Sequence, residues 1–259
     1  MKNIIITGAG TGMGLSMTKK FLANDWHVIM GVHNLDKAKA VYQELVQKYS
    51  PEKVTLKQVN VGDSRSVEEF SNEVNAENSH EVNAENSHID AIINNAGIFI
   101  GGQLQDLTEE EWDKTMAVDV KSIYLMTKAF IPGMIQHRAG SIINIASVAG
   151  LLGDYSMPAY NAAKGAVVNL VRSMALDYGP YGIRVNNINP GATNTPMFKG
   201  NPETVKQSYR DASPLKKIAE PEEIANVAYF LVSDQATAIT GQNIGASMGY
   251  GIWSGQPKQ

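Results

Sequence analysis

The stretch Ile4-Ile5-Ile6-Thr7-Gly8-Ala9-Gly10-Thr11-Gly12-Met13-Gly14 decides the fold of this chain. Its three isoleucines are β-branched and wholly apolar, which is typical of a strand that is buried on both faces. The glycines that follow permit a tight turn and let backbone N–H groups approach a pyrophosphate at the N-terminus of the next helix. Glycine-rich turns also occur without any ligand, but a strand before the turn and a helix after it favour a dinucleotide site.

Strand and helix patterns alternate along the rest of the chain. Such alternation predicts parallel strands joined by right-handed crossovers, with helices on both faces of the sheet. No segment has the composition of a linker, so we expect a single α/β domain over residues 1–259, a Rossmann-type doubly wound parallel sheet of about seven strands. We expect strands at 4–6, 28–32, 53–59, 89–94, 141–146, 183–188 and 242–246, and helices at 15–24, 36–49, from 64, from 108 to about 131, at 158–178 and from 221.

The composition limits the classes of function that remain. Of the 259 residues 43% are apolar and 19% are charged, which excludes disordered and fibrous classes. The formal net charge of −4 gives no bias toward nucleic acid or an anionic membrane, and the apolar runs are too short for a membrane helix or a signal peptide. The absence of cysteine excludes disulfides, thiol catalysis and thiolate metal sites. We therefore expect a soluble, cytoplasmic protein that binds neither nucleic acid nor membrane.

One segment is duplicated in tandem. Residues 73–80 recur unchanged at 81–88. Eight residues turn a helix by about 80° past two full turns, so Val82 cannot occupy the helix face that Val74 uses. We expect the extra copy to lengthen a surface helix or to form a loop, without a function of its own.

The spacing Gly8-x3-Gly12-x-Gly14 resembles the T-G-x-x-x-G-x-G motif of the short-chain dehydrogenase/reductase family. Asn94-Asn95-Ala96-Gly97 is similar to the N-N-A-G motif of that family, and Pro190-Gly191 with Thr195 is similar to its P-G-x-x-x-T segment, which holds the nicotinamide carboxamide. The resemblance extends over nearly the whole chain, including 181–186 and 239–242. It implies hydride transfer between a nicotinamide nucleotide and a small ketone or secondary alcohol.

The choice between the two nicotinamide nucleotides depends on the end of the second strand. In enzymes that use NAD(H), an acidic residue there binds the ribose 2′-OH, but this chain has Val32 followed by His33. The missing carboxylate removes a repulsion that would exclude a 2′-phosphate, which favours NADP(H) over NAD(H). Thr11 is not the arginine or lysine that often supports NADP(H), so NAD(H) stays open as the alternative. Asn60 replaces the acidic residue that the family has near the adenine.

The cofactor-binding residues that the resemblance implies are distributed over the ends of several strands. They are Gly8, Thr11, Gly12, Met13, Gly14, His33, Asn60, Val61, Asn95, Ala96, Gly97, Tyr160, Lys164, Pro190, Gly191, Thr193 and Thr195.

The pattern Tyr-x-x-x-Lys occurs three times, at 49–53, 124–128 and 160–164. Pro51 interrupts the first copy, and no hydroxyl residue at a strand end precedes the second. The third copy differs because Ser147 follows a predicted strand thirteen residues before Tyr160, where a sheet delivers it to the ligand crevice.

Carbonyl reduction requires a proton donor at the developing alkoxide. A free tyrosine, with a pKa of about 10, is too weak a base at neutral pH for the reverse reaction. The positive charges of Lys164 and the nicotinamide favour the tyrosinate, and Ser147 supplies a hydrogen bond to the substrate oxygen. We expect Tyr160 to act as the general acid and base.

Several positions depart from the family pattern. The fourth catalytic residue of the family is an asparagine that helps hold a water for proton relay, and Asp119 replaces it here. A second negative charge near a tyrosinate disfavours that anion. Residues 246–249 also differ from the V-D-G-G of the family, which bears on subunit packing. The five histidines show no ligand pattern, so we expect no metal site.

The expected substrate pocket is mostly apolar. We expect it to draw on 98–102, 149–157 and 192–217, with 201–214 as a mobile lid. Its candidate apolar residues are Leu151, Leu152, Tyr155, Met157, Met197 and Phe198.

Two other hypotheses remain beside an oxidoreductase. One is a regulatory protein that binds the cofactor with little catalysis, and the other is an epimerase or dehydratase that uses the same tyrosine and lysine. By analogy with the family we expect a homo-oligomer, either a tetramer or a dimer, with a small-molecule carbonyl or alcohol as the substrate.

Overall fold

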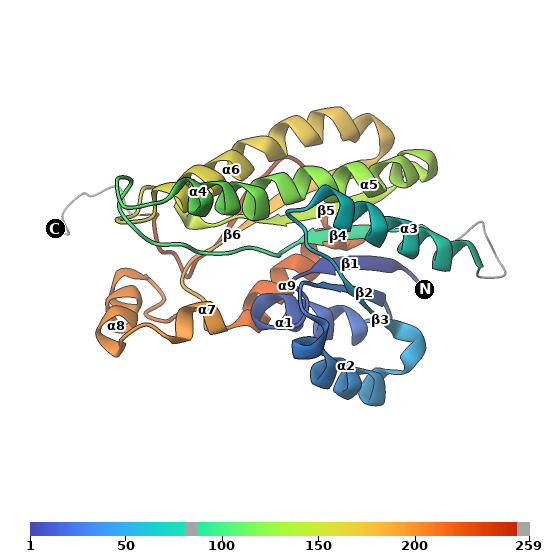
Figure 1. The fold of residues 1–259 in the computed structure, drawn as a ribbon, viewed down its shortest axis with the longest axis horizontal. Coiled ribbons are helices and arrows are strands. Elements are labelled where there is room, and N and C mark those ends of the chain that lie inside the picture. The colour runs from blue at the N-terminus through green and yellow to red at the C-terminus, as the bar shows by residue number, and fades with distance from the viewer. Residues whose placement is uncertain (81–87, 253–259) are drawn as a thin grey trace.

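The strands form one parallel sheet (Figure 1). The computed structural model describes residues 1–80 and 88–252, and within them seven strands lie in the order β3-β2-β1-β4-β5-β6-β7, each parallel to its neighbours. The chain passes from one half of the sheet to the other between β3 and β4, so the strand order reverses between the neighbouring strands β1 and β4, and ligands are expected at the carboxyl ends of these two strands. The strands are β1 (Asn3–Thr7), β2 (His27–Val32), β3 (Val54–Gln58), β4 (Ala91–Asn94), β5 (Gly140–Ile145), β6 (Ile183–Pro190) and β7 (Asn243–Ala246).

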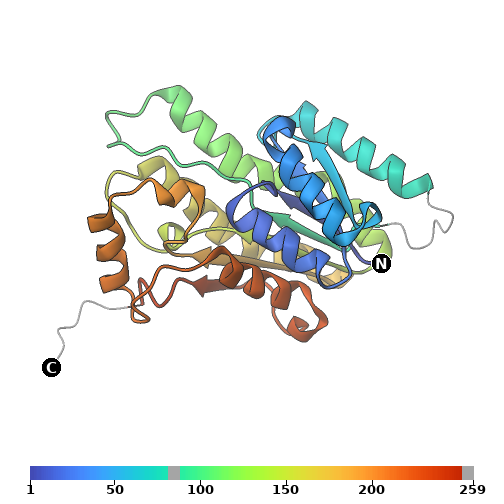
Figure 2. The same cartoon turned by 90° about the horizontal axis from the view of Figure 1, so that it is seen from below.

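Helices cover both faces of the sheet, which confirms the predicted doubly wound α/β fold. Helices α1, α2 and α9 pack on one face, where Figure 2 shows α1 beside α9, and α3, α4, α5 and α6 cover the other face. The helices of the described residues are α1 (Gly12–Leu22), α2 (Leu35–Tyr49), α3 (Ser64–His80), α4 (Glu109–Met116), α5 (Ser122–His137), α6 (Pro158–Tyr178), α7 (Pro196–Lys199), α8 (Glu203–Ala212) and α9 (Pro221–Val232).

The first strand divides the core into two layers. Ile4 and Ile6 pack with Phe21 of α1 on one side of the sheet, whereas Ile5 packs with Phe70 of α3 on the other side. Successive side chains of a strand point to opposite faces, so all three isoleucines are completely buried. This confirms the prediction of a strand that is buried on both faces.

Several predicted element boundaries differ from the structure: α1 covers Gly12–Leu22 rather than 15–24, β4 begins at Ala91 rather than at 89, and β6 continues to Pro190 rather than ending at 188. The helix expected to end near residue 131 continues to His137 with Pro132 inside it, and a π-helical turn at Ala117–Lys121 lies between α4 and α5. Proline often ends a helix, but α5 continues through Pro132. The strand expected from residue 53 begins at Val54, because a 3-10 turn at Pro51–Lys53 precedes it.

Two predicted surface features have different outcomes. The first copy of the duplicated segment forms the end of α3, where Val74 is buried, and residues 81–87 of the second copy lie outside the described residues. The stretch expected as a lid contains helix α8 rather than a continuous loop, and its mobility stays a prediction. Among the residues that the structure describes, no helix is long and apolar enough to cross a membrane.

Candidate active site

Three glycines of the turn between β1 and α1 stand at positions where a side chain would be strained or would clash, namely Gly8, Gly12 and Gly14. Gly8 and Gly12 have φ angles of +65° and +53°, in the left-handed region that favours glycine. A Cβ atom on Gly14 would lie 2.2 Å from the carbonyl oxygen of Gly8. The N–H of Gly8 donates to the carbonyl of Gly31 at 2.8 Å, which ties the turn to β2. At these glycine positions no side chain covers the backbone N–H groups at the N-terminus of α1, and an anion site requires such access.

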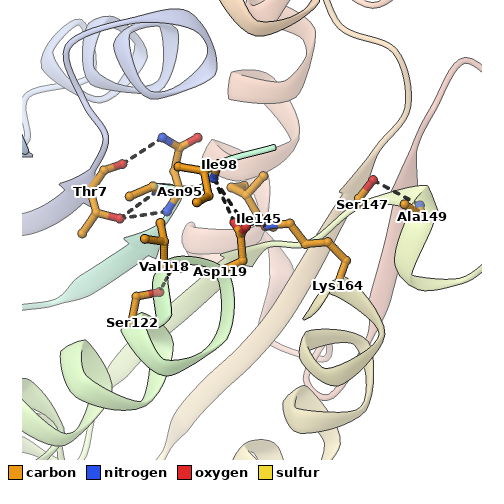
Figure 3. Close-up of polar contacts among 11 residues, drawn as sticks. Thr7, Asn95, Ile98, Val118, Asp119, Ser122, Ile145, Ser147, Ala149 and Lys164 are labelled. Carbon is orange, nitrogen blue, oxygen red and sulfur yellow. Dashed lines mark hydrogen bonds and ion pairs between the residues drawn. The ribbon is translucent and has the colours of Figure 1, made fainter. Parts of the chain in front are cut away.

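The stretch after β4 holds this turn in place (Figure 3). The Nδ2 of Asn95 donates to the carbonyl of Thr7 at 2.8 Å and to that of Gly8 at 3.3 Å. In return, the Oγ1 of Thr7 accepts hydrogen bonds of 3.0 Å from the N–H groups of Asn95 and Ala96. The glycine turn and the N-N-A-G motif thus form one rigid unit at the carboxyl ends of β1 and β4.

A cavity of about 750 Å³ opens in front of this unit. Sequence reasoning missed four polar or glycine positions in its wall, namely Gly31, Gly62, Asp63 and Lys114. The bare turn, the open helix N-terminus and the length of the wall from β2 to β4 fit a dinucleotide. Of the predicted cofactor-binding residues, the wall includes Gly8, Thr11, Gly12, Met13, Gly14, His33, Asn60, Val61, Asn95, Ala96, Gly97 and Thr195.

A second cavity, of about 370 Å³, adjoins the first. The two cavities share part of their walls, because the same residues line both: Met13, Asn95, Gly97, Ile98, Thr195 and Met197. The remaining predicted site residues all line this second cavity, namely Asp119, Ser147, Tyr160, Lys164, Pro190, Gly191 and Thr193. The structure thus brings every predicted site residue to one of two adjoining cavities.

Ser147 and Tyr160 reach the second cavity from two different elements. Ser147 follows β5, and its Oγ accepts a hydrogen bond of 3.1 Å from the N–H of Ala149 (Figure 3). Because this bond uses an oxygen lone pair, the hydroxyl proton stays available to a ligand. Tyr160 lies in the first turn of α6, where Phe99 packs edge-on against its ring at a centroid distance of 5.5 Å.

Lys164 forms a buried ion pair with Asp119 (Figure 3). The Lys164 Nζ lies 3.2 Å from the Asp119 Oδ1 and donates to the carbonyl of Ile145 at 3.1 Å. Asp119 lies within the π-helical turn, and its carboxylate also accepts a hydrogen bond of 3.2 Å from the N–H of Ile98. Both side chains are almost completely buried. The same Nζ lies 5.5 Å from the centre of the Tyr160 ring.

The two charges of this pair depend on each other. Burial lowers the pKa of Lys164, but the Asp119 carboxylate and the Tyr160 phenol outweigh it and hold that pKa above its ordinary value. Burial raises the pKa of Asp119, and the attraction of Lys164 and the Ile98 hydrogen bond offset only part of this increase. The lysine is therefore firmly cationic at neutral pH, and it requires the carboxylate as its partner.

Gly97 shows how tightly this pair is packed. A Cβ atom on Gly97 would lie 2.5 Å from the Asp119 Oδ1 and 3.5 Å from the Lys164 Nζ. The final glycine of the N-N-A-G motif therefore provides the space that the ion pair occupies.

A row of buried asparagine amides crosses the sheet beneath the site. The Nδ2 of Asn94 donates to the Oδ1 of Asn144, and the Nδ2 of Asn144 donates to the Oδ1 of Asn187. The Asn187 amide continues the row to Asn243, whose Nδ2 donates to the carbonyl of Val168 in α6. The row connects β4, β5, β6 and β7 to the helix that carries Tyr160.

Comparison with known proteins gives matches over almost the whole chain. A family model described as enoyl-(acyl carrier protein) reductase matches residues 8–251. The chain is 36% identical to the meso-2,3-butanediol dehydrogenase of Serratia marcescens, over 99% of this chain and 97% of that protein. The chain belongs to the short-chain dehydrogenase/reductase family.

Other proteins of similar sequence and structure agree with this membership. The 3-oxoacyl-[acyl-carrier-protein] reductase of Thermotoga maritima is 34% identical over 96% of this chain and 97% of its own length. A solved structure described as ElxO with NADP bound matches with a TM-score of 0.86 and 27% identity, covering 96% of this chain and 98% of that one. This short-chain dehydrogenase/reductase is thus a nicotinamide-dependent oxidoreductase that acts on CH–OH groups of small molecules.

The other two Tyr-x-x-x-Lys pairs of this short-chain dehydrogenase/reductase lie outside both cavities. Tyr124 is 54% exposed on α5, and the Lys128 Nζ lies 3.4 Å from its hydroxyl. Tyr49 ends α2, and Lys53 pairs with Asp25 at 2.7 Å.

The predicted apolar wall of the substrate pocket is correct only in part. Met157, Met197 and Phe198 line the second cavity, but Leu151, Leu152 and Tyr155 do not. These three side chains are exposed, because the chain turns outward between the 3-10 turn after Ser147 and α6. The three segments expected to form the pocket do reach its wall, with Phe99 from 98–102, Asp154 from 149–157 and Tyr209 from 192–217. Sequence reasoning missed Tyr250, which lies outside all three segments.

Proposed function

We propose that this short-chain dehydrogenase/reductase transfers a hydride between NADP(H) and a small ketone or secondary alcohol, with Tyr160 as the general acid and base. One observation carries the proposal: Ser147, Tyr160 and Lys164 line a single cavity that shares part of its wall with the cofactor cavity. A carbonyl bound between Ser147 and Tyr160 would therefore lie next to the cofactor.

The cofactor supplies or accepts the hydride when it is bound. In the proposal, the glycine turn and the N-terminus of α1 bind its pyrophosphate, and His33, Asn60 and Val61 bind its adenosine part. The segment from Pro190 to Thr195 binds the nicotinamide end, because its residues line the substrate cavity.

The side chains of the second cavity perform the proton chemistry. During reduction, the Tyr160 hydroxyl donates its proton to the substrate oxygen as negative charge develops there. The Ser147 hydroxyl donates a hydrogen bond to the same oxygen. The Lys164 ammonium stabilises the tyrosinate that remains, and Asp119 keeps Lys164 charged and fixed in position. During oxidation, the same residues act in the reverse order.

A panel of ketones and secondary alcohols, each tested with NADPH and NADH, examines this proposal through the nicotinamide absorbance. We expect substrate-dependent oxidation or reduction of the cofactor. Tight cofactor binding without turnover of any substrate would favour a regulatory protein. Product formation without a net change in absorbance would favour an epimerase or dehydratase.

The preference for NADP(H) rests on the end of β2. Val32 is buried there and offers no carboxylate to a ribose hydroxyl, whereas the imidazole of His33 lines the cofactor cavity. A 2′-phosphate beside His33 meets no acidic side chain from β2, and an imidazole N–H can donate a hydrogen bond to it.

Substitution of His33 by alanine tests this preference. We expect the dissociation constant for NADPH to rise by about two- to fivefold, the effect of losing one exposed hydrogen bond, and the dissociation constant for NADH to stay unchanged. Titration of the cofactor fluorescence measures both constants. Tighter binding of NADH than of NADPH by the unaltered protein would contradict the preference.

We also propose that the protein is a homo-oligomer, a dimer or a tetramer. The apolar side chain of Leu176 on α6 supports this, since it is 78% exposed beside a hollow lined by Arg172 and Gln242. Light scattering should give a mass that is a multiple of 28.1 kDa, and a mass of 28.1 kDa would exclude the oligomer.

A further inference from the structure

The substrate cavity contains a second group of polar side chains that the proton chemistry does not use. Asp154, Tyr209 and Tyr250 all line its wall together with Ser147 and Tyr160. They come from three segments far apart in the sequence: the turn before α6, helix α8 and the chain after β7. A substrate in this cavity therefore meets two chemically distinct sets of groups.

The aromatic members of this second group form a continuous surface. The Tyr209 and Tyr250 rings lie with their centroids 5.6 Å apart and their planes inclined by 50°. Phe198 packs edge-on against Tyr209 at 5.4 Å. Aromatic faces carry partial negative charge and attract cations that lie within about 6 Å of the ring centre.

Asp154 is the uncompensated charge of the cavity. The other charged residues in the wall are Asp119 and Lys164, and these two neutralise each other. Within residues 1–80 and 88–252, no hydrogen bond or ion pair to the Asp154 side chain is observed. Partial burial raises the pKa of Asp154, which indicates that its carboxylate has lost water without gaining a cation.

The two tyrosines respond to this charge. Burial, followed by the neighbouring negative charges that include Asp154, raises the pKa of Tyr209 and of Tyr250 above its ordinary value. Both phenols therefore stay neutral at physiological pH. Among the described residues, this part of the wall presents the Asp154 carboxylate beside two neutral aromatic rings, and the cationic side chain of the wall, Lys164, is already paired with Asp119.

We infer that Asp154, Tyr209 and Tyr250 bind a protonated amine of the substrate, so the preferred substrates are amino ketones and amino alcohols. The inference rests on the proposed function and specifies its substrate class. An ammonium group supplies the missing counter-charge and lies against the aromatic rings. An alkyl group leaves the carboxylate desolvated, a hydroxyl donates a hydrogen bond without neutralising the charge, and a carboxylate is repelled.

Two pairs of ketones with matched shape test the inference through kcat/KM for reduction at pH 7. Dimethylaminoacetone is compared with isobutyl methyl ketone, and dimethylaminoethyl methyl ketone with isoamyl methyl ketone, so that two chain lengths are covered. In at least one pair we expect kcat/KM to be about tenfold higher for the amine. In the Asp154→Asn variant the ratio should fall to about one, whereas the Asp106→Asn variant, altered at an exposed residue outside the cavities, keeps the wild-type ratio.

A kcat/KM for the apolar ketones of both lengths that equals or exceeds that for the amines would overturn the inference. A higher kcat/KM for hydroxyacetone, which carries a hydroxyl, or for laevulinate, which carries a carboxylate, than for both amines would also overturn it. Calorimetric binding of the same ketones to the Tyr160→Phe variant, with NADPH present, separates this result from failure of the proposed function. If the Tyr160→Phe variant binds an amine more tightly than the apolar ketone of the same shape, the inference is supported even where the wild-type protein shows no turnover. Equal binding of the two compounds overturns it.

Discussion

Replacement of Tyr160 by phenylalanine should lower kcat for ketone reduction by about 10²- to 10⁴-fold, the contribution of a positioned general acid. The ring of Phe fills the same space against Phe99, so the cavity keeps its shape and only the proton donor is lost. Ser147 still donates a hydrogen bond to the substrate oxygen, which explains why some turnover remains.

The chain provides a matched control for this variant. Tyr124 belongs to the same Tyr-x-x-x-Lys pattern, but it lies exposed on α5 and outside both cavities. Tyr124→Phe should keep kcat within about twofold of the wild-type value, within the range of neutral surface changes. Fluorescence titration should show that Tyr160→Phe still binds NADPH. Wild-type turnover in Tyr160→Phe would show that another group donates the proton.

Replacement of Asp119 by alanine should lower the free energy of unfolding by about 3–5 kcal/mol, because it leaves the buried Lys164 ammonium without its counter-charge. The carbonyl of Ile145 remains a hydrogen-bond acceptor for Lys164, but it carries no net charge. The N–H of Ile98 also loses its acceptor. Urea denaturation followed by circular dichroism measures the change.

The Asp119→Asn variant separates the charge from the hydrogen bonds. Its amide oxygen still accepts from the N–H of Ile98 and from Lys164, so we expect a smaller loss of stability than in Asp119→Ala. An equal midpoint for Asp119→Ala and the wild-type protein would mean that the pair does not stabilise the fold. Equal losses in the two variants would assign the whole effect to the charge.

Much of the fold was predictable because its signals are local. The β-branched run at Ile4–Ile6, the capping residues at Thr108 and Glu220 and the glycine turn each depend on a few neighbouring residues. The strand ends then converge because parallel strands deliver their carboxyl ends to one edge. That convergence is why the sequence was sufficient to predict that Ser147 and Tyr160 share a site.

The features that sequence reasoning missed depend on tertiary partners. The π-helical turn around Asp119 has no local sequence signal, and its buried carboxylate is held by Ile98 and Lys164 from other segments. Tyr250 reaches the substrate cavity from the chain after β7, outside the segments expected to form the pocket, and no spacing in the sequence relates it to Asp154.

The row of asparagine amides has a direction. Its last acceptor, the carbonyl of Val168, cannot donate, so the NH₂ group of Asn243 must point toward α6. Each amide before it is then fixed in turn, back to Asn94, whose Oδ1 has no partner among the described residues. The Nδ2 of Asn187 also donates to the carbonyl of Val167 at 2.9 Å, so two neighbouring carbonyls of α6 set the orientation of four side chains on four strands. Deamidation of Asn144 or Asn187 would set two acceptor oxygens against each other and break the row at that strand.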